Sequence, residues 1–371
     1  MMDLAFYKKT LGAAVANNYA YATCRLPKKQ TIKTYIAFDK PVLEPVITGS
    51  NRCFVFSPFD NGNKAYVLKQ SLYYEDGRLI NSTKADTRQF GFLHQAAQLT
   101  KQEIFYPSTQ KTQQIDEGHY LSFVNQSVDA IYDKQFKKIV AARCSSQKLS
   151  PNFDLIKYFQ KLCDTYTNAF IYIYSSPEIG TWVGATPEKL LTVENGTLQT
   201  VALAGTLEKN SKADWSKKEY EEQAYVEHFI SNVFSKIGVS NYRKGNVQTI
   251  AAGNLRHLQS AFSWQINEET IEQDFSQFLS VLNPTPAVCG LPKFEAAEFL
   301  KQHEGFERRF YSGFTGTIDR EETQLFVNLR CMEMMKDEAI LYAGAGITAD
   351  SVAENVWEET EKKMQTLGSL L

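Results

Sequence analysis

The chain has 371 residues, a hydrophobic content of 43% and a formal net charge of −2 at pH 7. This length fits two domains or one large domain, and the hydrophobic content is ample for a core. The near-neutral charge provides no bulk attraction to nucleic acid or to an anionic membrane, so neither is an expected partner. The six cysteines are scattered without a C-x-x-C pair, and no signal-like N-terminus or long apolar run occurs. We therefore expect a reduced, cytoplasmic protein without a membrane span.

The first third of the chain predicts a scaffold of short elements. A helix is expected over residues 3–20, followed by strands at 31–37, 52–56 and 65–68 with turns rich in Pro, Gly and Asn between them. Asp76-Gly77 predicts a further hairpin. Residues 82–127 are polar and give no clear pattern.

A strand that begins with a lysine opens the part of the chain that carries the chemistry. A helix over residues 127–136 is predicted to lead into a strand at 138–144, where alternation places Lys138 on the same face as Val140 and Ala142. A lysine amine that is desolvated on a buried face becomes a better base. By position alone, however, a lysine at a strand entrance more often extends its amine to water.

Glu188 lies at a similar strand entrance. A helix at 154–165 and a strand at 169–174 precede it, and Asn195-Gly196 closes the hairpin that follows. A glutamate at such a position is most often an exposed charge. To act as a general acid near neutral pH, it would need a raised pKa.

Two helices combine carboxylates with an apolar stripe. Ser216 and Glu219 have capping-box spacing, and the helix that they open, to about residue 236, places Glu219 and Glu222 on the same face as Val226. Carboxylates on a buried helix face need partners, and a bound cation is one such partner. An alternative for Glu219 is that it favours the dipole of the first helical turn.

The C-terminal fifty residues repeat this pattern. A strand over 325–334 carries Arg330, a second strand over 339–343 runs into a glycine turn at 344–346, and a capping box at 351–354 opens a helix. On that helix Val352, Val356, Glu359 and Lys363 share one face. Together the two helices predict a magnesium site in which water and substrate complete the coordination.

Several motifs resemble those of the chorismate-utilising enzymes, which include isochorismate synthase, salicylate synthase, anthranilate synthase component I and aminodeoxychorismate synthase component I. They are, in chain order, Lys138-Ile-Val-Ala-Ala-Arg143, Gly184-Ala-Thr-Pro-Glu188, Leu203-Ala-Gly-Thr206, Lys218-Glu-Tyr-Glu-Glu222, Asn283-Pro-Thr-Pro-Ala287, Arg308-Arg-Phe-Tyr-Ser-Gly313, Leu341-Tyr-Ala-Gly-Ala-Gly-Ile347 and Trp357-Glu-Glu-Thr-Glu-Lys-Lys363. Gln223 and Asn283 stand where the family usually has histidine.

This resemblance covers residues 128–371 well and residues 1–125 only loosely. It implies one chorismate-binding domain over residues 1–371, in which the catalytic portion is 128–371 and the N-terminal portion is a scaffold. The implied fold is α+β, with large antiparallel sheets, helices packed outside and the active site in a central cleft.

The resemblance also implies a role for each site residue. Lys138 would be the general base that activates water, and Glu188 the general acid that protonates the departing hydroxyl. Glu222 and Glu359 would bind Mg²⁺, with Glu219 as a further candidate. The implied substrate-binding residues are Ala204, Gly205, Thr206, His257, Ala287, Tyr311, Gly313, Arg330, Gly344, Gly346 and Lys363.

Within the family, the residues favour the conversion of chorismate to isochorismate. Lys138 argues against anthranilate synthase, Ala204 argues against aminodeoxychorismate synthase, and Ala287 is typical of isochorismate rather than salicylate synthases. Salicylate synthase is the alternative activity, and a non-catalytic protein that binds an anionic metabolite is the alternative class. Because water is the nucleophile, we expect no glutaminase subunit. A monomer is expected, although no sequence feature fixes the oligomeric state. Menaquinone and siderophore synthesis are both open as uses of the product.

Overall fold

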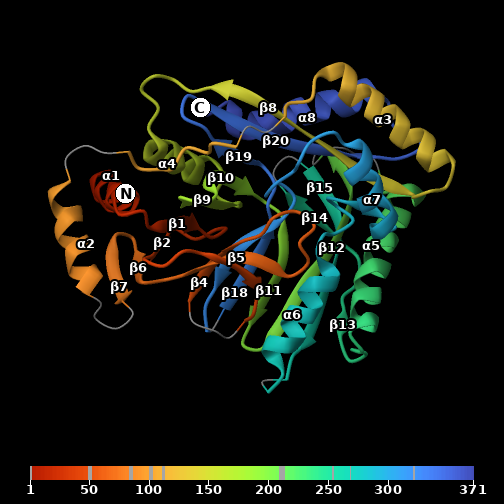
Figure 1. The fold of residues 1–371 in the computed structure, drawn as a ribbon. Coiled ribbons are helices and arrows are strands. Elements are labelled where there is room, and N and C mark those ends of the chain that lie inside the picture. The colour runs from red at the N-terminus through yellow and green to blue at the C-terminus, as the bar shows by residue number, and fades with distance from the viewer. Residues whose placement is uncertain are drawn as a thin grey trace.

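The fold is built from two large antiparallel sheets with helices on their outer faces (Figure 1). The computed structural model describes residues 2–48, 52–82, 87–99, 103–110, 113–208, 214–252, 255–267, 269–320 and 322–371. The α+β architecture with antiparallel sheets is the one predicted. None of the described helices is both long and apolar enough to span a bilayer.

The first sheet, sheet A, has the strand order β16-β8-β20-β19-β10-β9-β1-β2-β6-β7. Its strands are β1 (Ala20–Arg25), β2 (Ile32–Ala37), β6 (Leu72–Glu75), β7 (Arg78–Ser82), β8 (Lys138–Lys148), β9 (Phe170–Ser176), β10 (Gly180–Thr186), β16 (Gly290–Leu291), β19 (Cys331–Met334) and β20 (Glu338–Ile347). The longest pairing joins β8 to β20, and it extends from Lys148 opposite Glu338 to Ile139 opposite Ile347.

The second sheet, sheet B, has the order β13-β15-β12-β11-β18-β17-β4-β5-β3, and β14 pairs with β15. Its strands are β3 (Val42–Pro45), β4 (Cys53–Phe56), β5 (Lys64–Lys69), β11 (Lys189–Glu194), β12 (Thr197–Glu208), β13 (Arg243–Lys244), β14 (Gln248–Ala252), β15 (Leu255–Gln265), β17 (Phe314–Ile318) and β18 (Glu322–Val327). Side chains from both sheets meet in an aromatic core, in which the Phe56 and Phe310 rings stack with centroids 4.4 Å apart.

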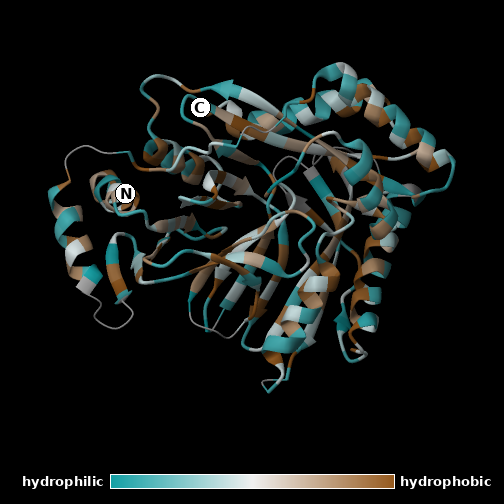
Figure 2. Cartoon of the chain, viewed as in Figure 1, coloured by the Kyte–Doolittle hydropathy of each residue, from teal (hydrophilic) through white to brown (hydrophobic). Residues whose placement is uncertain are grey.

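The described residues form eight helices: α1 (Leu4–Ala16), α2 (Thr87–Gln98), α3 (Glu117–Tyr132), α4 (Leu155–Thr165), α5 (Lys217–Lys236), α6 (Ile271–Leu282), α7 (Lys293–His303) and α8 (Ala353–Gly368). Helices α1, α4 and α8 bury apolar residues against sheet A, and α5 and α6 bury theirs against sheet B. Figure 2 shows hydrophobic and hydrophilic residues interleaved along α5 and α6, as expected of helices with one buried face.

The sequence predicted most of these elements. The turn at Asp76-Gly77 joins β6 to β7, and the turn at Asn195-Gly196 joins β11 to β12; all four residues have positive φ. The stretch that gave no pattern, residues 82–127, contains α2 and most of α3. The prediction of a helix start at residue 127 was wrong, because α3 begins at Glu117 with Asp116 as its N-cap.

Two C-terminal predictions were wrong in ways that matter for the site. The strand expected over 325–334 is broken into β18 and β19, and Arg330 lies in the break with φ at 47°. The expected glycine turn is instead the end of β20, where Gly344 pairs with Ala142 of β8. A side chain at Gly344 would place Cβ 2.9 Å from the carbonyl oxygen of Ala141, so the close approach of these strands requires glycine.

The two predicted capping boxes differ in outcome. At α5 the backbone N–H of Ser216 donates to the Glu219 carboxylate (2.8 Å), as a capping box requires. At α8 the prediction was wrong: the N-cap is Val352, and Ser351 instead accepts a hydrogen bond from the backbone of Thr348 at 2.9 Å. Val352 and the Glu359 side chain are each 51% exposed, so neither shares the buried stripe of α8 with Val356, and the prediction of a buried carboxylate on this helix was wrong.

Candidate functional site

A cavity of about 300 Å³ lies between the start of β8, the end of β12 and helix α5. Its lining residues are Lys137, Lys138, Leu203, Ala204, Gly205, Glu222, Tyr225, Val226, His257, Pro286, Ala287, Leu291 and Thr348. These residues come from both sheets and from the segment before α7. The structure therefore brings together Lys138, Ala204, Gly205, Glu222, His257 and Ala287 from the predicted set.

Two neighbouring crossovers between the sheets place Glu188 beside Arg330. The chain passes from β10 in sheet A to β11 in sheet B through Glu188, and it returns from β18 to β19 through Arg330. The backbone N–H of Val327 donates to the carbonyl of Glu188, and that of Ala185 donates to the carbonyl of Arg330, both at 2.9 Å. These two bonds fix the crossovers side by side.

The Glu188 carboxyl lies within electrostatic range of three cationic side chains. Burial raises the pKa of its carboxyl above the usual value, and the positive charges of Lys138, Arg330 and Lys363 oppose this rise. The net shift is upward, so desolvation outweighs the three cations. A carboxyl group with a raised pKa holds a proton nearer to neutral pH, as the sequence prediction required of a general acid.

Among the described residues, the charged groups of Lys138, Glu188 and Arg330 are not paired with other side chains. No residue in the described part of the chain forms a hydrogen bond or a close ion pair with the Lys138 amine, the Glu188 carboxylate or the Arg330 guanidinium. Partly buried charges are usually paired when their role is structural. This set is therefore arranged to meet a ligand.

Lys363 and Glu359 extend the cluster from helix α8. The Lys363 amine donates to the carbonyl of Gly344 (2.8 Å) and pairs with the Glu359 carboxylate (2.5 Å). Burial lowers the pKa of Lys363, while the Glu359 carboxylate opposes that change. The carbonyl of Gly344 thus orients Lys363, and Gly346 leaves room for Lys138, because a Cβ there would lie 3.2 Å from its Cε.

The carboxylates predicted to hold magnesium lie on different elements around the site. Glu222 lines the cavity from α5, and Glu359 lies within electrostatic range of Arg330 on α8. Carboxylate oxygens are ligands that suit Mg²⁺, so the chemistry of each of these two donors fits the ion. The described residues contain no group of three or more His, Cys, Asp or Glu that could hold a metal without such help. The Glu219 carboxylate accepts the capping hydrogen bond of α5, as in the alternative given above, and its role as a metal ligand stays a prediction.

The other predicted residues differ in their surroundings. His257 bonds through Nδ1 to the carbonyl of Gly205 (2.9 Å), which requires the proton on Nδ1. Tyr311 is buried near Arg330, and its hydroxyl lies 2.9 Å from where a Cβ of Gly344 would be. Gly313 donates its N–H to the carbonyl of Phe310 and packs against the backbone of Ser57, so this amide does not reach a ligand. The side chain of Thr206 lies outside the described residues.

Several residues of the site were missed by the sequence analysis. Lys137 and Tyr225 line the cavity, and the Lys137 amine lies 4.6 Å from the centre of the Tyr225 ring. The spacing of Tyr225 three residues after Glu222, on the same helix face, could have indicated it. The buried pair of Glu304 and Arg308 was also missed, because nothing in the sequence shows which charges are buried together.

The Glu304–Arg308 pair supports the strand that carries Lys138. Glu304 accepts a hydrogen bond from the backbone N–H of Ala142 (2.8 Å), and Arg308 donates to the carbonyls of Val140 (2.6 Å) and Val288 (2.7 Å). Both side chains are at most 4% exposed. The pair therefore provides hydrogen-bond partners for backbone groups of β8 beyond its short pairing with β16. It also holds the segment that carries Ala287.

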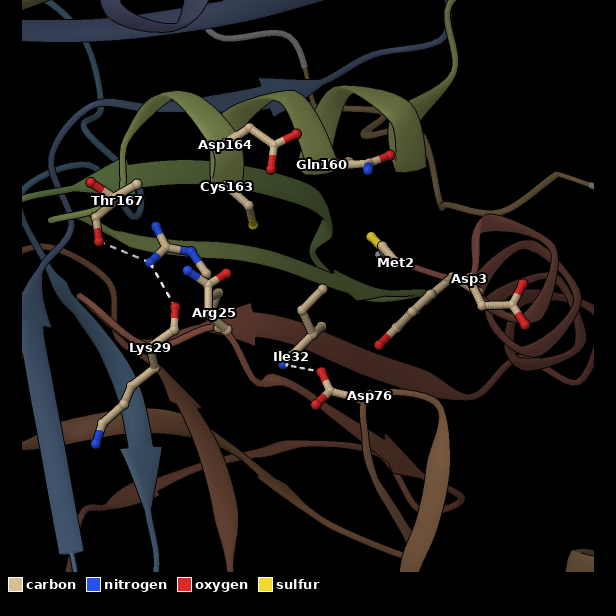
Figure 3. A pocket seen from close by; sticks show the side chains of 12 residues that line it. Met2, Asp3, Arg25, Lys29, Ile32, Asp76, Gln160, Cys163, Asp164 and Thr167 are labelled. Atoms are coloured by element: carbon tan, nitrogen blue, oxygen red, sulfur yellow. Dashed lines mark hydrogen bonds between the residues drawn. The ribbon is translucent and has the colours of Figure 1, made fainter.

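A second cavity, of about 560 Å³, lies apart from the predicted site residues (Figure 3). It is lined by Tyr7, Arg25, Cys163 and neighbouring side chains. The buried Arg25 donates to backbone carbonyls, including those of Lys29 and Thr167. Arg25 thus ties the end of β1 to the segment after α4, and no predicted site residue lines this cavity.

The two sheets, the central crossovers and the unpaired charges define a ligand-binding α+β protein with its site between the sheets. The chorismate binding enzyme family matches residues 59–371, so the chain belongs to this family.

Two curated relatives and one solved structure illustrate the similarity. The isochorismate synthase MenF of Pasteurella multocida is 28% identical over 295 residues, which cover 74% of this chain and 65% of that protein. The vibriobactin-specific isochorismate synthase of Vibrio cholerae is 25% identical over 286 residues, which cover 74% of this chain and 71% of that protein. The structure of MenF, the menaquinone-specific isochorismate synthase from Escherichia coli, superposes with a TM-score of 0.77 at 20% identity, covering 97% of this chain and 91% of that one. The match to the Pasteurella protein thus spans slightly less than two thirds of its length.

Proposed function

We propose that this protein converts chorismate to isochorismate. The observation that carries the proposal is the set of unpaired charges on Lys138, Glu188 and Arg330 at the crossovers between the sheets. An exchange of hydroxyl positions on a ring requires a base and a protonated acid, and Lys138 and Glu188 can take these roles because neither side chain is paired with another described side chain. The names of the relatives described above support the same activity.

The reaction needs one proton removed and one proton supplied. Lys138 takes a proton from a water molecule while that water forms a bond to ring C2. The two conjugated double bonds of the ring shift (C1=C2 to C1=C6, and C5=C6 to C4=C5), the bond from C4 to its hydroxyl breaks, and Glu188 donates its proton so that the hydroxyl leaves as water. Water consumed and water released balance, and solvent returns the two residues to their starting protonation states.

Arg330 and Lys363 are suited to hold the carboxylates of chorismate. The planar guanidinium of Arg330 can bind a carboxylate through two parallel hydrogen bonds. Glu222 and Glu359 would hold Mg²⁺, which when bound helps to delocalise negative charge from the ring carboxylate in the transition state. Because water is the nucleophile, no subunit that supplies ammonia is needed.

The direct test is to incubate the purified protein with chorismate and Mg²⁺ in water enriched in ¹⁸O, and to resolve the products by NMR and mass spectrometry. We expect isochorismate with one ¹⁸O atom at C2. Salicylate and pyruvate would instead assign the alternative activity of a salicylate synthase. Binding of chorismate without any conversion would contradict the enzymatic proposal and favour a non-catalytic binding protein.

Lys138→Ala tests the base assignment. We expect it to abolish turnover while the circular dichroism spectrum stays unchanged, because Lys138 makes no hydrogen bond or close ion pair among the described residues. Lys148→Ala is the matched control, since it lies exposed at the other end of the same strand. Turnover of Lys138→Ala at the wild-type rate would remove this residue from the mechanism.

A further inference from the structure

Arg143 joins β8 to helix α8 beneath the site. Its side chain is 2% exposed, and its guanidinium carbon lies 3.5 Å from the centre of the Trp357 ring. Its Nε donates to the hydroxyl of Thr360 at 2.7 Å, and its Nη2 pairs with the Glu361 carboxylate at the more exposed end. One buried cation thus contacts three residues, Trp357, Thr360 and Glu361, within about one and a half turns of a single helix.

The hydroxyl of Thr360 acts both as a hydrogen-bond acceptor and as a donor. It accepts the hydrogen bond from Arg143 and donates its own proton to the carbonyl of Trp357 at 2.7 Å. Thr360 is fully buried, so water cannot replace either partner. This arrangement fixes the rotation of α8 about its axis, whereas apolar packing alone tolerates small rotations.

That rotation decides where two site residues point. Glu359 immediately precedes Thr360 and Lys363 follows it by three positions, so both lie on the same side of Thr360 on the helix surface, and a rotation of α8 moves them together. Side-chain ends lie roughly 6 Å from a helix axis, so a rotation of about 20° would move them by about 2 Å. A displacement of about 1 Å is enough to cost roughly a hundredfold in a catalytic arrangement.

We propose that Arg143, through Thr360, is a positioning residue that sets the rotation of α8 and thereby directs Glu359 and Lys363 into the site. The proposal rests on the proposed function, since it assigns Glu359 to a metal and Lys363 to the substrate. Figure 1 shows α8 lying along β8 and β20, so this strand pair is the surface against which the rotation of the helix is set.

The test compares Thr360→Val, which keeps the shape but removes the hydroxyl, with Thr360→Ser, which keeps the hydroxyl. Glu358→Gln is the matched control, because its exposed pair with Lys362 lies on the outer face of the same helix. The measurements are the dissociation constant of Mn²⁺, from electron paramagnetic resonance without substrate, the KM for chorismate and the midpoint of thermal unfolding. For Thr360→Val we expect the Mn²⁺ dissociation constant to rise about tenfold, with a higher KM. Thr360→Ser and Glu358→Gln should both stay within twofold of the wild type.

A purely structural role predicts a different result. If Thr360→Val lowers the unfolding midpoint but leaves Mn²⁺ binding and KM unchanged, the positioning proposal is overturned. It is overturned equally if the wild-type protein binds no Mn²⁺. A wild-type protein that binds Mn²⁺ yet converts no chorismate would overturn the proposed function alone, because the metal measurement does not depend on turnover.

Discussion

Gly346→Ala tests how tightly the position of Lys138 is set. Gly346 has no positive φ, so alanine fits its backbone, and the only consequence lies in the space beside it. The added methyl group would lie 3.2 Å from Cε and 3.8 Å from Nζ of Lys138. Ordinary carbon contacts need about 3.5–4.0 Å, so the lysine side chain must move by about 0.5 Å. Since a shift of about 1 Å costs roughly a hundredfold, we expect kcat to fall by about tenfold.

The assay is steady-state formation of isochorismate, followed together with thermal unfolding. We expect the unfolding midpoint of Gly346→Ala to stay close to that of the wild type, because Lys138 can move toward the cavity. Gly91→Ala in α2 is the control: no atom lies within 4 Å of its new Cβ, so it should gain about 0.5–1 kcal/mol in stability and keep full turnover. A wild-type kcat in Gly346→Ala would refute the reasoning that Lys138 needs this exact placement.

Three further perturbations follow from the charges of the site. The raised pKa of Glu188 means that turnover should fall as pH rises through that pKa. Glu188→Gln should be inactive, yet at pH 8 it should unfold at a higher temperature than the wild type. At pH 4 this difference should disappear, because the Glu188 carboxyl of the wild type is then mostly protonated in both the folded and the unfolded protein. Glu304→Gln leaves the charge of Arg308 buried without its carboxylate, so urea denaturation should show a loss of about 3–5 kcal/mol, and a loss below about 1 kcal/mol would contradict the buried pair. Chelation by EDTA should stop turnover reversibly without changing the circular dichroism spectrum, because Glu222 and Glu359 belong to helices that are packed by apolar residues; activity that persists after exhaustive chelation would exclude a required metal.

The elements with strong local patterns were predictable from the sequence. Strand alternation indicated β8 with Lys138 at its start, and Asn195-Gly196 indicated the hairpin of β11 and β12. The break at Arg330 was not predictable, because residues 325–334 have the apolar character of one continuous strand and only long-range pairing divides them between two sheets. The capping box of α8 failed for a different, local reason, since the hydroxyl of Ser351 accepts a hydrogen bond from the backbone of Thr348.

The site, too, has features that the sequence could predict and features that it could not. Lys138, Glu222 and His257 could be selected by motif, and the structure gathers them around one cavity. The contacts that join the surrounding elements were not predictable: the hydrogen bond from Arg143 of β8 to Thr360 of α8 links residues more than 200 positions apart. Such pairings depend on the three-dimensional arrangement of the sheets, which no local pattern contains.

The left-handed backbone conformation of Arg330 lowers the stability of the fold at a residue that we propose binds the substrate. A residue other than glycine loses about 1–2 kcal/mol in this conformation, and no described side chain compensates the loss by binding the guanidinium. Glycine at this position would relax the backbone but remove the guanidinium that we propose binds a carboxylate of the substrate. Selection for thermal stability alone would therefore drive this position away from arginine, and under the proposed function a variant stabilised in that way would bind its substrate more weakly.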